Sequence, residues 1–173
     1  VHRVGRHRQA GRRGSRTGND TINNAIAAGG VVIAALDFRN PPEASYPGSV
    51  ADINYAVRWL KSQAERFDTR PELVGTMGTS SGGHLAVLVA LKPDDPRYRS
   101  IPLDGGAAID AHVPYVVTMW PVICPGSRYR ALQAKIAAGQ GKENWPKLLE
   151  DQMEYWLTDD AMEEGSANLV VQR

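Results

Sequence analysis

The sequence predicts an α/β fold, with a mostly parallel sheet flanked by helices. Apolar runs of strand length lie at residues 31–36, 73–78 and 113–120. They lack the alternation of half-exposed strands, which is typical of parallel strands covered on both faces. Helical segments lie between them, and strands that alternate with helices form βαβ units around a parallel sheet.

Length and composition narrow the class of protein. The 173 residues are enough for one domain with a hydrophobic core, and 42% hydrophobic with 23% charged residues is ordinary for a soluble protein. Cys124 is the only cysteine, which excludes an intramolecular disulfide and a cysteine-rich zinc site. No run approaches the roughly 18 apolar residues of a membrane span, and no signal peptide is evident. We therefore expect a cytoplasmic protein with no membrane span, no metal and no cofactor.

Charge divides the chain into a basic head and an acidic body. Residues 1–18 hold six arginines and no acid, whereas the other 14 basic residues face 19 acids, leaving a net charge of −5. The head is rich in glycine and buries too little apolar surface to offset its chain entropy, so we expect it to be disordered. We expect an incomplete core domain over 19–125, and a helical cap segment with a truncated end over 126–173.

The first half of the core is expected to begin with a helix over 19–28, which Gly29 and Gly30 end. The strand over 31–36 follows. A second helix starts at Ser49, with Asp52 as its capping-box partner. Its apolar face recurs at helical spacing, with members Ile53, Val57, Leu60, Ala64 and Phe67.

The second half starts with the strand over 73–78 and a helix that is apolar on all sides, so this helix should be buried. The strand over 113–120 is followed by two further helices, expected at 129–138 and 145–157. An apolar stripe marks the second of these, formed by Leu149, Met153 and Trp156. Residues 168–172 are expected to be a short strand or an extended end.

The chemical signal is the G-x-S-x-G sequence of residues 78–82, between a predicted strand and a buried helix. This context is that of a nucleophile elbow, in which Ser80 occupies a strained turn at the carboxyl end of the sheet. Glycines allow the backbones to approach closely, here Gly78, Gly82 and Gly83. The amide of Ser81 at the helix N-terminus is placed to donate to an oxyanion. The alternative is a serine- and glycine-rich loop without chemistry.

In these segments the chain resembles the serine esterase and lipase branch of the α/β-hydrolase superfamily, related to hormone-sensitive lipase and bacterial carboxylesterases. The matching segments are 34–39, Tyr46-Pro47 with Asp52, 56–60 and 78–86. The resemblance implies hydrolysis of small carboxylic esters through an acyl-enzyme, without a cofactor. It gives Ser80 the role of nucleophile and Ser81 that of oxyanion-hole amide, and it implies that the later helices are a cap over the site.

A nucleophilic serine also needs a histidine base and an orienting acid, which follow it in this superfamily. The histidines after Ser80 are His84 and His112. We expect His84 to pack or hydrogen-bond beside the elbow, and His112 to lie at the opposite end of the sheet. Family members also carry a His-Gly-Gly segment near the front of the fold, whereas His2 is followed by Arg3-Val4. We therefore expect an incomplete fragment with weak or no turnover alone, and hypothesise that residues 1–18 come from a displaced reading frame or a mis-set start.

Two other functions remain open. A pseudoenzyme or association module would use the same fold without chemistry, and its exposed strand edges would favour self-association. Nucleic-acid binding by the arginines of the head is disfavoured, because the head carries no aromatic residue for stacking and no recognised motif.

Overall fold

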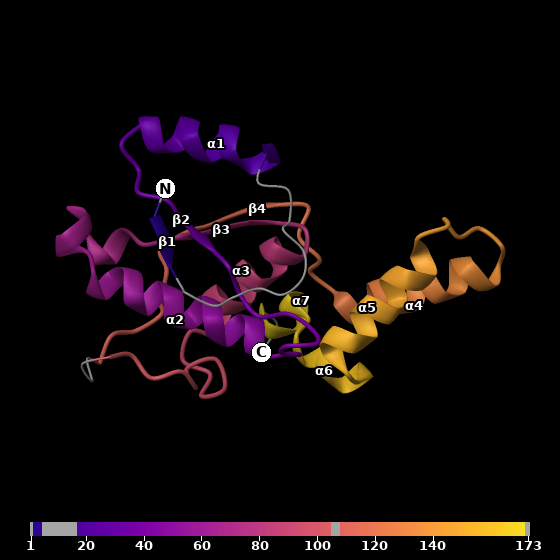
Figure 1. Cartoon of the computed structure of the whole chain (residues 1–173). Coiled ribbons are helices and arrows are strands. Elements are labelled where there is room, and N and C mark those ends of the chain that lie inside the picture. Colours follow the sequence, from indigo (N-terminus) through magenta and orange to yellow (C-terminus); the bar gives the residue numbers. More distant parts are fainter. Residues whose placement is uncertain (1, 5–16, 105–107, 172–173) are drawn as a thin grey trace.

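Among the described residues, four short strands form two parallel pairs. The computed structural model describes residues 2–4, 17–104 and 108–171. Strand β1 (His2–Val4) pairs with β2 (Ala34–Leu36), and β3 (Thr76–Thr79) pairs with β4 (Val116–Met119). Both pairs are parallel and helices lie between the strands in the chain (Figure 1), so the predicted α/β class with a parallel sheet is confirmed.

The first part of the chain contributes three helices and two short 3₁₀ turns. These elements are α1 (Thr17–Ala28), α2 (Gly48–Ser62), η1 (Glu65–Phe67), η2 (Pro71–Leu73) and α3 (Ser81–Leu91). Helix α3 packs on both β3 and β4 and against α2. It is apolar on all sides and mostly buried, as its sequence predicts.

The last part of the chain is helical. Its elements are α4 (Pro125–Ala137), α5 (Trp145–Trp156), α6 (Asp159–Glu164) and α7 (Ala167–Val171). Helices α4 and α5 pack on each other and project from the rest of the molecule, whereas α7 returns to α3 (Figure 1). The extended end expected at 168–172 is therefore wrong for the described residues. Directly before α7, the Ser166 hydroxyl donates to Met162 O at 2.8 Å. The packing of α7 on α3 overrides the preference of the valines in α7 for a strand.

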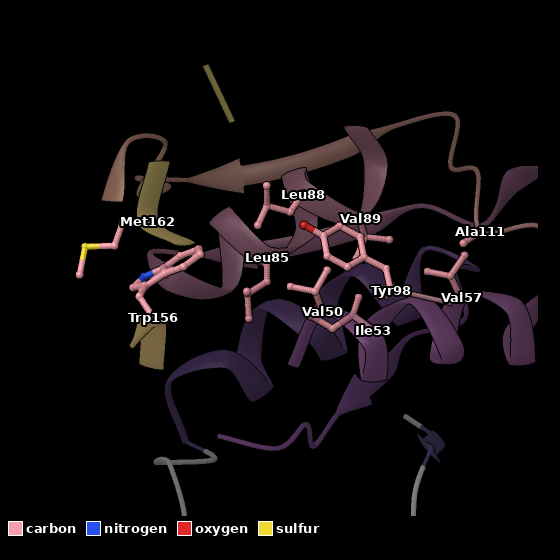
Figure 2. Packing of buried hydrophobic residues seen from close by; sticks show 10 residues of the cluster. All are labelled: Val50, Ile53, Val57, Leu85, Leu88, Val89, Tyr98, Ala111, Trp156 and Met162. Carbon is pink, nitrogen blue, oxygen red and sulfur yellow. The ribbon is translucent and has the colours of Figure 1, made fainter. Parts of the chain in front are cut away.

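The hydrophobic core joins the helices of both parts. Its buried members come from α2, α3, the loop after α3, and the α5–α6 region (Figure 2): Val50, Ile53, Val57, Leu85, Leu88, Val89, Tyr98, Ala111, Trp156 and Met162. Trp156 and Met162 belong to the segment predicted as a cap, yet they are 4% and 0% exposed. The start of α6 and the end of α5 are thus anchored in the core.

The expected capping box at Ser49 and Asp52 is wrong. Helix α2 begins at Gly48 after Pro47, with no side-chain cap. The Asp52 carboxylate instead accepts the backbone N–H of Arg39 at 2.8 Å and its guanidinium at 2.7 Å. The Ser49 hydroxyl donates to Arg39 O at 2.5 Å. Both side chains therefore bond to the loop after β2. They do not bond to the free backbone N–H groups at the start of α2, as a capping box would require.

Two short pieces of the region 1–18 have regular structure. His2–Val4 pair in register with Ala34–Leu36, so the strand backbone finds hydrogen-bond partners. Thr17 and Gly18 open α1. Residues 1 and 5–16 lie outside the described part of the chain. No helix among the described residues is long and apolar enough to span a bilayer.

Candidate active site

Ser80 lies in the turn between β3 and α3 with φ 55° and ψ −122°. A positive φ is uncommon for a residue with a side chain, and strained conformations of this kind cluster at functional sites. The side chain is exposed, at the carboxyl end of β3. This is the backbone geometry that the G-x-S-x-G sequence predicts for a nucleophile elbow.

The close approach around the elbow falls on Gly78 and Gly83. A Cβ atom on Gly78 would lie 2.7 Å from Gly83 N, and one on Gly83 would lie 3.0 Å from Gly78 O. A Cβ on Gly82 would meet nothing within 4 Å. The strand and the first turn of the helix thus approach each other closely at Gly78 and Gly83, whereas a side chain at Gly82 would contact no other group.

The end of β4 holds the turn from the other side. The Ser80 amide donates to Met119 O at 2.9 Å, and Ser80 O accepts from Val122 N at 3.4 Å and from His84 N at 3.1 Å. These bonds fix the peptide groups on both sides of Ser80. Its side chain makes no hydrogen bond to any described residue, so the hydroxyl is available to other groups.

Ser81 is the first residue of α3, so its N–H has no partner within the helix. Partial positive charge gathers at a helix N-terminus and favours an anion there. The amide following the nucleophile is the position that contributes to an oxyanion hole in an elbow of this type. The arrangement is therefore able to stabilise negative charge beside Ser80.

His84 packs inside the molecule, as predicted. It is 3% exposed, its Nε2 lies 2.7 Å from Gly165 O, and its ring is centred 5.5 Å from that of Trp156. Burial lowers the pKa of the imidazole, against the hydrogen bond to Gly165 O, which raises it. The histidine thus ties α3 to the end of α6 and is directed away from solvent.

A charged cluster next to Gly165 holds α6 in place. The Arg97 guanidinium donates to Asp95 Oδ2 at 2.7 Å and to Glu164 Oε2 at 3.0 Å. It lowers the pKa of both carboxyls, mainly through these hydrogen bonds. Gly165, whose carbonyl bonds to His84, therefore directly follows Glu164, which is held in this ion pair.

His112 lies before β4, at the amino end of that strand, where the sequence places it. Its Nε2 is 2.9 Å from Asp94 Oδ2, and both side chains are more than 60% exposed. Asp110 accepts from Lys61 at 2.7 Å, and this bond is the main cause of the lowered pKa of its carboxyl. Asp159 and Asp160 form the first turn of α6, which Thr158 caps. Within the described ranges, no histidine or acid bonds to the Ser80 hydroxyl.

No group of three or more His, Cys, Asp or Glu side chains in the described part of the chain is arranged to hold a metal ion. One neighbour of Ser80 was missed from the sequence, Trp120, which is 82% exposed directly after β4. The sequence feature that could have identified Trp120 is a large aromatic residue at the end of the predicted strand over 113–120.

Comparison with known proteins agrees with this geometry. The BD-FAE family model matches residues 8–122, which is more than half of the chain. The chain belongs to the BD-FAE family. The resemblance to α/β-hydrolase esterases is thereby confirmed.

Relatives of this BD-FAE chain are named as esterases. It is 30% identical over 90 residues to the probable carboxylic ester hydrolase LipM, and 30% identical over 93 residues to the esterase LipC, both of Mycobacterium tuberculosis. These matches cover 52% and 53% of this chain, but only 21% and 23% of the relatives. The chain thus spans less than a quarter of the length of these two curated relatives.

The structure of esterase B from Lactobacillus rhamnosis is similar, with a TM-score of 0.64 and 22% identity. The match covers 89% of this chain and 46% of that one. This likeness establishes the fold.

Proposed function

We propose that the chain carries the nucleophile of a serine ester hydrolase, with Ser80 attacking the carbonyl of a short or medium acyl ester. The observation that carries the proposal is the left-handed backbone of Ser80 between β3 and α3. The names of LipM and LipC as ester hydrolases support the reaction class.

In the proposed reaction the Ser80 oxygen forms a bond to the ester carbonyl carbon, and the carbonyl oxygen becomes an oxyanion. The Ser81 amide donates to this oxyanion at the positive end of α3. The oxyanion then collapses, the alcohol leaves with a proton, and an acyl-Ser80 ester remains for water to hydrolyse. Gly78 and Gly83 support these steps by allowing the turn to form.

A base must take the Ser80 proton, and an acid must orient that base. His84 is buried against Gly165 and His112 lies at the other end of β4. We propose that both groups come from outside the described residues. Without them the acylation rate falls by roughly four orders of magnitude, so the chain alone is expected to acylate slowly. We further propose that α4 and α5, which follow the site in the chain, belong to the segment that covers it.

The proposal is tested with p-nitrophenyl acetate and mass spectrometry of the intact chain. We expect one acetyl group to accumulate on Ser80 and none in Ser80→Ala. Ser62→Ala serves as a matched control, because Ser62 is an exposed serine at the far end of α2. An equal acetyl yield in Ser80→Ala would overturn the proposal.

A second candidate function, association without catalysis, is favoured by one observation. Met77 and Val117 are paired in register on β3 and β4, and they are 46% and 50% exposed. A second copy of the chain would cover this apolar face. Light scattering after size exclusion distinguishes the two, since a monomer at all concentrations would argue against association.

A further inference from the structure

Trp120 combines two features that are unfavourable for a folded chain. Its side chain is 82% exposed, the highest value among the large hydrophobic residues that the structure describes, and its φ is 49°. A left-handed backbone is a genuine outlier for a bulky residue. Such strain persists only where the surroundings fix it, and it is concentrated at ligand-binding and active sites.

The surroundings that fix Trp120 are those of Ser80. Thr79 and Met119 are register partners on the parallel strands β3 and β4, so Ser80 and Trp120 are the next residues of the two strands. Neighbouring strands in a sheet lie about 4.8 Å apart. Hydrogen bonds from Ser80 N to Met119 O, and from Val122 N to Ser80 O, bracket Trp120 on both sides. Both residues leave the sheet with positive φ at the same edge.

We propose that Trp120 is a specificity-determining residue, which binds the aromatic group of an aryl ester while the ester carbonyl lies at Ser80. This inference deepens the proposed function and rests on it. The indole offers a large flat apolar face, which packs favourably against another aromatic ring. A small alkyl ester presents little surface to it, so the site would favour aryl over alkyl esters.

The first test is NMR of the Ser80→Ala chain with ¹⁵N-labelled tryptophan, titrated with phenyl acetate and with ethyl acetate. The indole signals are assigned by Trp120→Phe and, as a control on α5, by Trp145→Phe. We expect phenyl acetate to shift the Trp120 signal, and ethyl acetate to shift it much less. No shift at Trp120, equal shifts by the two esters, or a shift that depends on protein concentration without ester would overturn the inference.

The second test is the affinity for phenyl acetate in the same background. Trp120→Ala should weaken binding by about 2- to 10-fold, whereas Trp120→Phe should retain most of it. An unchanged affinity in Trp120→Ala would overturn the inference. A Trp120 shift together with no acylation of Ser80 would overturn the proposed function alone, and acylation without a Trp120 shift would overturn the inference alone.

Discussion

A Cβ atom on Gly78 would lie 2.7 Å from the amide nitrogen of Gly83, which is closer than the Cβ atoms of real proteins approach other groups. The close packing of the strand and the helix on either side of Ser80 therefore requires that residue 78 has no side chain. We expect Gly78→Ala to destabilise the fold by about 1 to 3 kcal/mol, because backbone would have to move.

Gly82→Ala is the matched control for this change. A Cβ there meets nothing within 4 Å, and alanine is the better helix former by about 1 kcal/mol. Urea unfolding of both variants checks the prediction. Equal losses of stability would show that the close approach at Gly78 is not required.

The buried His84 predicts a pH-dependent stability. Because burial lowers its pKa, the folded state binds a proton less readily than the unfolded state, whose histidine titrates at about 6.5. Stability should therefore fall as the pH drops through this value, and level off below the folded-state pKa. Urea midpoints at pH 7.5 and 5.5 measure the loss, which His84→Gln should reduce.

His112→Gln is the control for this measurement, since His112 is exposed and lies apart from Gly165. A wild-type loss that persists in His84→Gln but disappears in His112→Gln would contradict the assignment.

Asp52 and Arg39 are expected to contribute to stability as an energetically coupled pair. It accepts both the backbone N–H and the guanidinium of Arg39. We expect Asp52→Ala to lower the free energy of unfolding by about 1 to 2 kcal/mol, in the range of hydrogen bonds to charged groups in partly exposed positions. In a double-mutant cycle with Arg39→Ala, Asp52→Ala should cost less than it does alone, because only its bond to the backbone N–H of residue 39 remains to be lost. Fully additive losses would argue against the pair.

A cysteine at position 80 reports the electrostatics of the elbow. In a Cys124→Ser background, we expect the pKa of the thiol in Ser80→Cys to lie below its usual value of about 8.5, because the N-terminus of α3 favours the thiolate. Ser62→Cys, at the C-terminal end of α2, should show no such decrease. The pH dependence of alkylation by iodoacetamide measures both, and equal pKa values would contradict the favourable field at Ser80.

The sequence predicted the features that depend on local pattern. The positions of β3, α3 and Ser80 follow from an apolar run, a glycine-rich turn and a second apolar run. The errors arose where a distant contact decided the structure. Asp52 bonds to Arg39 instead of capping α2, and Val170 lies in a helix because α7 packs on α3. Trp120 was missed because its conformation depends on the pairing of β3 with β4.

The role of Ser80 as the nucleophile is tested most directly by the site of labelling by a fluorophosphonate, which reacts with activated serine hydroxyls. The labelled chain is digested, and the modified peptide is identified by mass spectrometry, with Ser80→Ala and Ser62→Ala treated in parallel. We expect slow labelling of Ser80 in the wild-type chain and in Ser62→Ala, and none at any serine in Ser80→Ala. Labelling spread over other serines, or no labelling of Ser80 at all, would contradict its role as the nucleophile.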